Sequence, residues 1–341
     1  MKKKSSSQLK LSFIFTALIF LVIISLMIGN YPLSSSDLKL ILRQLLSGSR
    51  AELSANPAWA VLYYIRLPRI LTVVLVGAAL SLSGSSYQNI FRNPLVSPDI
   101  LGVSAGAGLG VALGLLYTEG SILYVYFSAF FMGITAVFLT YWLSKVSGKK
   151  SSMFMVLAGI VVASLANALI SLLKYTADPL EKLPGIVFYL MGGFSRVSWR
   201  EFYLILPIIL LGAFVLIFLR WQLNIFSLGE AQAASLGVDT EKIKIIVIVF
   251  STMMVSAATA AAGQVSWVGL VVPHIARFIV GTKHKFLLPA SALIGAFLLL
   301  LMDNLARTLS GAEIPISIIT ALIGAPFFAY LLISDRESGW S

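Results

Sequence analysis

Long apolar stretches alternate with short polar segments along the whole chain. A helix needs about 20 consecutive apolar residues to cross a bilayer, and about ten stretches reach or approach that length. They lie at Leu11–Gly29, Ile70–Tyr87, Ile100–Tyr117, Ile122–Leu143, Met153–Leu173, Phe202–Leu219, Ile243–Ala262, Val265–Val280, Phe286–Ala306 and Ile314–Ile333. The pattern predicts an all-α polytopic membrane protein with about ten transmembrane helices.

Three segments depart from this simple pattern. Val265–Val280 is short and contains Pro273, and Ile186–Phe194 is too short to cross, so it is expected to be a re-entrant or interfacial helix. The first run follows three lysines like a signal peptide, but it is longer than the usual apolar region and lacks a small-residue cleavage site. We therefore expect an anchor that is retained, and one membrane domain spanning 1–341 with a cytoplasmic tail at 1–10.

Composition excludes an ordinary soluble protein, because 58% of the residues are apolar and only 11% are charged, against roughly 25% charged in a typical soluble domain. The net charge of +11 comes from basic residues scattered singly at the ends of the apolar runs. That distribution favours orientation in a lipid bilayer over nucleic-acid binding. If the N-terminus is cytoplasmic, 15 of the 25 Lys and Arg residues lie on the cytoplasmic side of the predicted spans. This asymmetry predicts that both termini are cytoplasmic.

Several kinds of chemistry have no residues to support them. The chain has no cysteine and only two histidines, His274 and His284, so no metal site or cofactor is expected. A phosphate-binding loop is missing too, because the nearest fragment, Gly148–Ser151, lacks the upstream glycine. Nearly all 14 acidic residues lie at run ends or in loops, which argues against an ion-driven carrier. Any energy for active transport must therefore come from a partner.

Small residues recur at helical spacing in two runs. Gly102, Gly106, Gly110 and Gly114 follow one another every four residues, and Gly77 begins a weaker stripe that continues through serines at 81 and 85. Such spacing creates a ridge without side chains, against which another helix packs closely. The two stripes predict a tightly packed bundle.

A set of motifs extends over most of the chain in a fixed order. They are Arg66–Arg69, Gly77–Leu80, Arg92–Leu95, Pro98–Gly102, Leu157–Gly159, Met191–Phe194 with Trp199 and Arg200, Leu228–Glu230, Leu236–Val238, Val268–Arg277, Leu287–Pro289, Asp303–Arg307 and Gly324–Pro326. In this order and spacing they resemble the FecCD-type permeases of bacterial ABC importers.

The resemblance implies a type II ABC importer permease fold in the bacterial cytoplasmic (inner) membrane. It implies a second permease subunit, two cytoplasmic ABC ATPase subunits and a substrate-binding protein outside, so that this chain is itself no enzyme. A homodimer is the default expectation, because closed two-fold pairs are the commonest assembly, although two different permeases remain an alternative. The expected cargo is a metal chelate, with an iron–siderophore complex favoured over cobalamin, haem or a molybdate-type oxyanion.

The resemblance also assigns roles to three arginines. Arg66, Arg69 and Arg307 match family positions that dock acidic residues of the binding protein, and all three are expected at outer helix ends. The alternatives are snorkelling to the membrane interface and, for Arg307, a local pair with Asp303 four residues earlier.

The coupling segment is expected within residues 220–242, where short helices would seat in the ATPase. The residues that carry the resemblance are Leu228, Gly229, Glu230, Ala234, Leu236, Gly237 and Val238. A plain solvated loop is the alternative. Glu230 is expected to cap a helix or form a local ion pair.

The translocation pathway has three candidate residues. The loop Lys145–Met153 resembles the inner gate of the family, which makes Ser151 and Ser152 gate candidates, and Asn167 is the polar candidate on the pathway. An interhelical hydrogen bond would explain Asn167 equally well. His274 is expected to satisfy backbone groups that the adjacent Pro273 leaves free.

Some outer segments depart from the family pattern, among them Gly263–Trp267, Met302 before Asp303, and Ile314–Ser317. These departures concern the choice of cargo and partner more than the transport class. The rival hypothesis is a secondary carrier or channel that works without an ATPase, and the shortage of carboxylates inside the helices disfavours it.

Overall fold

The computed structural model describes residues 2–29, 31, 33–47, 56–118, 121–146 and 152–334, and every regular element in these ranges is helical. The elements are α1 (Lys2–Met27), α2 (Ser35–Ser47), α4 (Pro57–Ala60), the π-helical η1 (Val61–Arg66), α5 (Leu67–Ile90), the 3₁₀ turn η2 (Pro98–Leu101), α6 (Val103–Tyr117), α7 (Ile122–Val146), α8 (Ser152–Thr176), α9 (Leu183–Leu190), α10 (Trp199–Phe218), α11 (Arg220–Phe226), α12 (Glu230–Ser235), α13 (Thr240–Ala262), α14 (Val268–Val280), α15 (His284–Thr308) and α16 (Ile316–Ser334). Each of the ten apolar runs coincides with one of these helices.

Seven of the helical segments are long and apolar enough to cross a membrane, and α6, α14 and most of α16 form three shorter apolar helices. The all-helical polytopic fold is therefore confirmed. The short run expected at Ile186–Phe194 overlaps the eight-residue helix α9, Leu183–Leu190.

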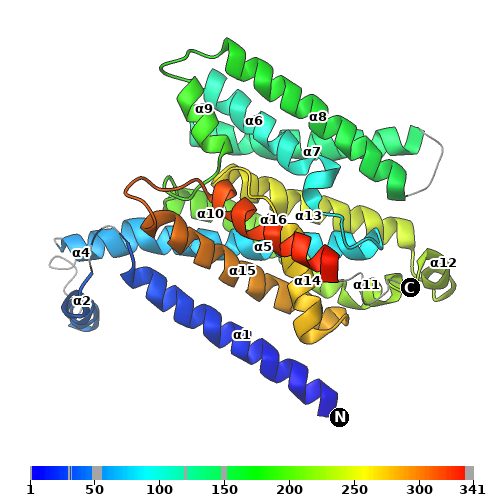
Figure 1. Ribbon diagram of the computed structural model, residues 1–341, viewed down its shortest axis with the longest axis horizontal. Coiled ribbons are helices and arrows are strands. Elements are labelled where there is room, and N and C mark those ends of the chain that lie inside the picture. The colour runs from blue at the N-terminus through cyan, green and yellow to red at the C-terminus, as the bar shows by residue number, and fades with distance from the viewer. Residues whose placement is uncertain are drawn as a thin grey trace.

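Helix α5 occupies the centre of the bundle (Figure 1). It packs against α15, α13, α14 and α10. In the continuous helical segment Pro57–Ile90, which contains α5, 67% of the most apolar part is buried, against 17% for α1. Helices α6 to α9 form a group along one side, and α1 runs along the opposite edge (Figure 1). The core is thus built around α5, and α1 is peripheral.

The stripes of small residues lie where helices cross most closely. A Cβ added at Gly110 would collide with the backbone carbonyl of Ser128 on α7, and a Cβ at Gly77 would collide with the backbone of Gly295 on α15. Close backbone approach of this kind is how membrane helices gain packing contacts. The predicted tight packing is confirmed at both stripes.

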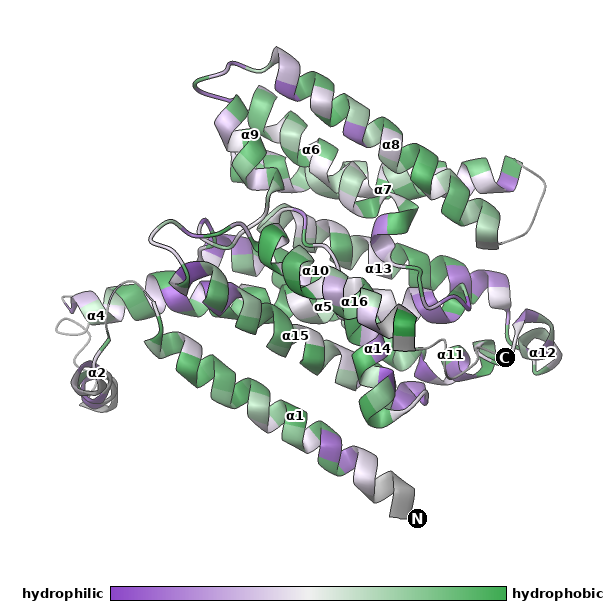
Figure 2. Ribbon diagram, in the orientation of Figure 1, coloured by the Kyte–Doolittle hydropathy of each residue, from purple (hydrophilic) through white to green (hydrophobic). Residues whose placement is uncertain are grey.

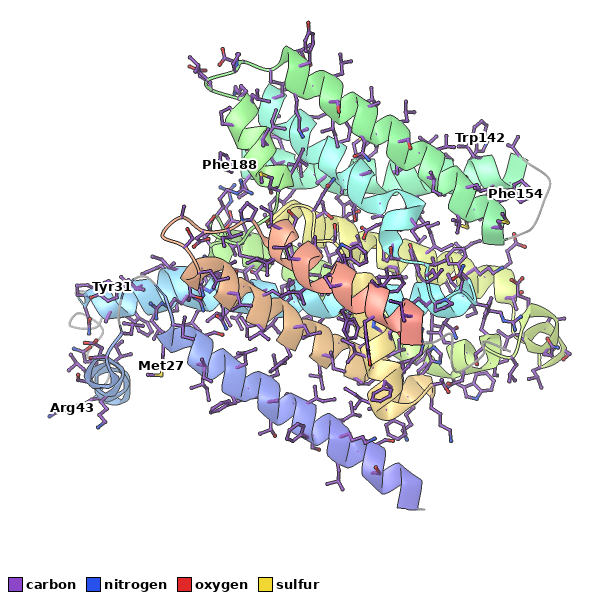
Figure 3. The ribbon with its side chains drawn as sticks, in the orientation of Figure 1. Met27, Tyr31, Arg43, Trp142, Phe154 and Phe188 are labelled. Carbon is purple, nitrogen blue, oxygen red and sulfur yellow. The ribbon has the colours of Figure 1, made fainter. Side chains whose placement is uncertain are left out.

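The long helices share a common direction, so the bundle has two ends (Figure 1). The α4 end carries α2, α4, the start of α5 and the end of α15; the α12 end carries α11, α12 and both the first and the last described turns. Hydrophilic residues gather toward these two ends, and apolar residues dominate the helices between them (Figure 2). Trp142 and Phe154 lie at the α12 end of their helices, whereas Met27, Tyr31 and Arg43 lie at the α4 end (Figure 3).

Several helix boundaries differ from those that the apolar pattern predicts, and two of the differences have a clear physical reason. The helix expected to begin at Ile70 is part of a longer helical segment that begins at Pro57. Arg66 and Arg69 can lie inside this segment because distant residues, Leu26 and Asp303, accept their hydrogen bonds. The helix expected at Val265 begins at Val268, since Trp267 adopts a left-handed backbone conformation with φ of 71°.

Candidate functional site

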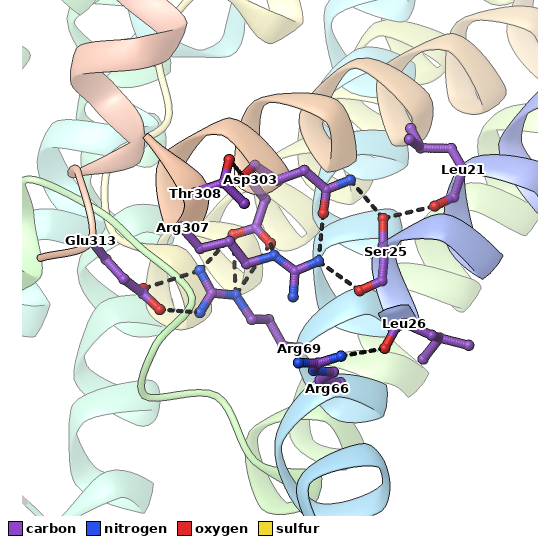
Figure 4. A network of polar contacts seen from close by, with 10 residues as sticks. Leu21, Ser25, Leu26, Arg66, Arg69, Asp303, Arg307, Thr308 and Glu313 are labelled. Atoms are coloured by element: carbon purple, nitrogen blue, oxygen red, sulfur yellow. Dashed lines mark hydrogen bonds and ion pairs between the residues drawn. The ribbon is translucent and has the colours of Figure 1, made fainter. Parts of the chain in front are cut away.

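Arg69, in the first turn of α5, is held between two carboxylates (Figure 4). Its guanidinium donates to Asp303 on α15 at 2.9–3.2 Å and to Glu313 in the α15–α16 loop at 2.6 and 3.0 Å. Arg69 is 6% exposed and Asp303 is 1% exposed. A charge at this depth requires a partner, because an unpaired buried charge is strongly unfavourable. Arg69 thereby joins α5, α15 and the loop before α16.

Arg307 extends this network from α15 toward α1. Its Nη2 donates to the backbone carbonyl of Ser25 at 2.7 Å and to the side chain of Asn304 at 2.5 Å (Figure 4). The Nε of Arg307 lies 4.0 Å from Asp303, so the local pair considered from the sequence is present. The closer partner of Asp303 is nevertheless Arg69, at 2.9 Å, and no local sequence spacing predicts this pair.

Arg66 fixes the C-terminal end of α1. Its Nη1 donates to the carbonyl of Leu26 and its Nη2 to the carbonyl of Tyr31, both at 2.5 Å. The last carbonyls of a helix lack partners within the helix, so a guanidinium at this position satisfies one of them. Arg66 therefore connects the spanning segment that contains α5 to α1.

A cavity of about 250 Å³ opens among these charged groups at the α4 end. It is lined by Gly29, Tyr31, Val61, Ile65, Arg66, Arg69, Arg307 and Glu313. In the network around it, three arginines face the two carboxylates of Asp303 and Glu313, so one positive charge is left over. Such a site favours a negatively charged group.

The three arginines lie together at one end of the bundle, as the sequence suggested. Their exposed fractions are only 3% for Arg66, 6% for Arg69 and 5% for Arg307. The guanidinium groups therefore point into the protein, and a partner would reach them through the cavity. Their docking role remains a prediction.

Residues 220–242, the predicted coupling segment, lie at the opposite, α12 end, and the short helices expected there are α11 and α12. Leu228 and Leu236 are more than half exposed, Ala234 and Gly237 are also exposed, and Val238 is buried. Gly229, buried with φ of 118°, allows the turn between α11 and α12. The segment thus presents apolar side chains at a hydrophilic end of the molecule.

Glu230 forms an ion pair with Lys244 at 2.5 Å, which confirms the expectation that it pairs locally. Both side chains are substantially exposed, and such pairs contribute little to stability. The pair connects the start of α12 to the first turns of α13.

Asn224, on α11, is a contact that the sequence did not indicate. Its Oδ1 accepts from the backbone N–H of His284 at 2.9 Å and lies 3.1 Å from the Nδ1 of the same residue. The first N–H groups of a helix have no partner within the helix, so Asn224 caps α15 from outside. The coupling segment is thereby attached to the helix whose far end carries Asp303 and Arg307.

Helix α8 carries a polar stripe, made of Ser164, Asn167 and Ser171, along an exposed face. The spacing of three and four residues places the three side chains on one side of the helix. Another exposed face of α8 is apolar and includes Leu165 and Leu169. Polar side chains are costly against lipid and normally face protein or water, so the two faces have different surroundings in the membrane.

The two gate candidates before Asn167 lie at the start of α8 or just before it. Ser151 lies outside the described residues, and Ser152 begins α8 without a described side chain. A Cβ at Gly159 would collide with the carbonyl of Ile100, so α8 crosses η2 closely there. In η2, burial raises the pKa of the Asp99 carboxyl, which accepts a hydrogen bond from Ser104.

His274 forms a hydrogen bond with the carbonyl of Leu270 at 2.9 Å, and its ring lies edge-on to Phe328. Pro273 removes the helical hydrogen bond to the carbonyl of Gly269 rather than to that of Leu270, so the role expected for His274 beside the proline stays a prediction. Within the described ranges, no three His, Asp or Glu side chains come together in an arrangement suited to a metal ion.

A family model, the FecCD transport family, matches residues 17–334. The chain therefore belongs to the FecCD transport family, whose members are permeases of ABC importers. It has the type II importer permease fold, because it superimposes with a TM-score of 0.84 on a solved structure described as an inward-facing, metal-chelate-type ABC transporter. The two chains are 40% identical, and the match covers 95% of this chain and 98% of the other.

Curated relatives cover nearly the whole chain. The molybdate import system permease protein MolB of Haemophilus influenzae is 42% identical over 324 residues, which is 94% of each chain. A relative in Helicobacter pylori named for iron chelatin transport is 35% identical and spans 96% of this chain and 99% of its own. The hemin transport permease HmuU of Yersinia pestis is 37% identical over 83% of this chain and 86% of its own.

Proposed function

We propose that two copies of this chain form the membrane pathway of an ATP-driven importer. A binding protein delivers cargo at the α4 end, and two ATPase subunits act on the α12 end. The observation that carries this proposal is the separation of the two surfaces: the arginine-lined cavity lies at one end, the apolar coupling segment lies at the other, and α15 connects them.

The α12 end is assigned to the cytoplasm of a bacterial cell. Helix α1 begins at this end with Lys2, Lys3 and Lys4, and basic residues next to a spanning segment favour the cytoplasmic side. Both termini are then cytoplasmic and the cavity faces outward. A positively charged cavity would steer and orient an acidic partner more than it would add affinity.

Exposed leucines support an ATPase contact. Leu228 and Leu236 are 59% and 58% exposed, at an end of the molecule where hydrophilic residues gather (Figure 2). Apolar side chains gathered on a polar surface commonly mark an interaction site. Closure of the ATPases would then move α11 and α12 as a rigid unit.

The polar stripe of α8 is assigned to the pathway, with Asn167 at its centre. The loop before α8, with Ser151 and Ser152, is assigned to the inner gate. A hydroxyl- and amide-lined surface without carboxylates suits cargo that is neutral or negatively charged. The second permease subunit would face this stripe across the two-fold axis.

The cargo is proposed to be a metal held in an oxyanion or a chelate. The relative named for molybdate favours the oxyanion, and those named for iron chelatin and hemin favour the chelate that the sequence alone suggested. Neither form requires a resident metal in this chain.

The test is ATPase activity and uptake in proteoliposomes. The chain is purified from its native host with the subunits that accompany it, and binding proteins loaded with molybdate, ferric siderophore, hemin or cobalamin are added in turn. Stimulation of ATP hydrolysis and uptake by one loaded protein supports the proposal and identifies the cargo.

The rival hypothesis makes the opposite prediction in the same vesicles. A secondary carrier would move solute down a proton or sodium gradient with neither ATPase nor binding protein present. Gradient-driven uptake by this chain alone would overturn the importer proposal.

A further inference from the structure

The two carboxylates that hold Arg69 differ in accessibility. The side chain of Asp303 is 1% exposed and belongs to α15, whereas that of Glu313 is 35% exposed and belongs to a loop. Both bind the guanidinium through close contacts, and together they use donors on Nε, Nη1 and Nη2. Arg69 therefore has little capacity for an additional carboxylate while Glu313 stays in place.

The surroundings of Glu313 could accept another negatively charged group. Glu313 lines the cavity of about 250 Å³ together with Arg66 and Arg307. The three arginines outnumber the two carboxylates of Asp303 and Glu313, so the network has one more positive than negative charge. A carboxylate that entered the cavity would thus find room and an unbalanced positive charge.

We propose that Glu313 is a displaceable internal ligand of Arg69, which a carboxylate of the binding protein replaces during docking. This inference rests on the proposed docking at the α4 end. Glu313 acts as a positioning residue: it holds Arg69 and its own loop in the undocked arrangement, while Asp303 retains Arg69 throughout. The incoming group is an acidic side chain, because only a carboxylate reproduces the paired contacts that Glu313 gives up.

Displacement of Glu313 would reach the rest of the protein through the α15–α16 loop. Ile316, three residues later, donates its N–H to the carbonyl of Gly192 at 3.1 Å, and Ser317 donates its hydroxyl to the carbonyl of Met191 at 2.6 Å. The start of α16 is therefore attached to the segment that follows α9. Release of Glu313 loosens one side of this connection and makes the α15–α16 loop sensitive to docking.

The first test compares binding affinities of the assembled complex for the binding protein that supports uptake in the proteoliposome experiment. Glu313→Gln removes the competing charge, so binding should tighten by roughly two- to fivefold, the range of one partly exposed ion pair. Glu181→Gln, in the α8–α9 segment at the same end and outside the network, is the matched control and should bind like the wild type. Unchanged or weaker binding by Glu313→Gln overturns the proposal.

The second test follows the loop directly. The chain has no cysteine, so a spin label at Ala312→Cys, an exposed position, reports on the loop alone. The label should become more mobile when the binding protein docks, and it should already be mobile in the Glu313→Gln background. Equal mobility in all four samples overturns the displacement.

The same labelled position separates this inference from the docking proposal beneath it. A bifunctional reagent on Ala312→Cys should capture the binding protein if it docks at the α4 end. Failure of capture while uptake continues would refute docking there; successful capture without tighter binding by Glu313→Gln would refute only the role of Glu313.

Discussion

Arg69 carries its charge inside the bundle because two carboxylates meet it there. Removing one partner of a buried ion pair leaves an uncompensated charge, whereas removing a partly exposed partner leaves a charge that water can reach. The two carboxylates bound to Arg69 therefore differ in energetic importance.

We predict that Asp303→Asn lowers the free energy of unfolding by about 3 kcal/mol, as expected for a broken buried pair. Glu313→Gln should lower it by less than about 1 kcal/mol, because Glu313 is one-third exposed. Denaturation of the purified permease in mixed micelles measures both values. Equal losses in the two variants would contradict the assignment of Asp303 as the structural partner and Glu313 as the replaceable one.

At this scale the sequence revealed the arginines but not their partners. Arg69 lies 234 residues from Asp303 and 244 from Glu313, so no local spacing rule connects them. The one pair that such a rule does predict, Arg307 with Asp303, is present at the longest distance in the network, 4.0 Å. Asn224 was missed for the same reason, since its partner is 60 residues away.

Helices in this bundle depend on close approach at glycines. On α6, Gly110 has the carbonyl of Ser128 where a Cβ would lie, whereas a Cβ at Gly185 on α9 would meet nothing within 4 Å. The same substitution at these two positions therefore separates packing from helix propensity.

We predict that Gly110→Ala destabilises the permease by about 1–3 kcal/mol through overpacking, although Ala is favoured over Gly in a helix by about 1 kcal/mol. Gly185→Ala should leave stability unchanged or raise it slightly. Thermal unfolding in detergent measures both. A loss at Gly185 as large as that at Gly110 would show that the cost does not come from the α6–α7 contact.

Asn224 attaches α11 to the first turn of α15. Asn224→Ala removes the cap on His284, so stimulation of ATP hydrolysis by the loaded binding protein should fall several-fold, while basal hydrolysis persists. Asn224→Asp retains the acceptor oxygen and should keep more of the stimulation. If Asn224→Ala and the wild type respond alike, movement passes between the two ends by another route.

Apolar periodicity located the ten helices because spanning length and hydrophobicity are properties of each segment alone. It misplaced helix ends where a tertiary contact or a backbone conformation determines the end. Arg66 is tolerated inside a helix because the carbonyls of Leu26 and Tyr31 accept its hydrogen bonds, and the left-handed conformation of Trp267 delays the start of α14. The glycine spacing predicted close packing, but which helix would lie against α6 required the structure.

In the whole molecule, the positions of the proposed docking and coupling ends follow from the order of motifs along the chain, while the burial of the arginines does not. Arg66 and Arg307, predicted at outer helix ends, are only 3% and 5% exposed, because both donate to carbonyls at the end of α1 and just after it. The sequence therefore predicts the class of protein and the direction of transport better than it predicts how a partner reaches the site.

The two exposed faces of α8 allow the proposed pathway to be tested in the assembled importer. We predict that cysteines introduced at Asn167 and Ser171 react with a membrane-impermeant maleimide, because these positions would line a water-filled space between the two permease subunits. Cysteines at Leu165 and Leu169, on the apolar face of the same helix, should react at least tenfold more slowly, since a thiol surrounded by lipid or protein is rarely ionised. The reactivity of the polar pair should also change between nucleotide-free and ATP-bound complexes, because alternating access closes the space on one side at a time. Equal and nucleotide-independent rates at all four positions would place the pathway elsewhere in the dimer, and Asn167 would then serve helix packing.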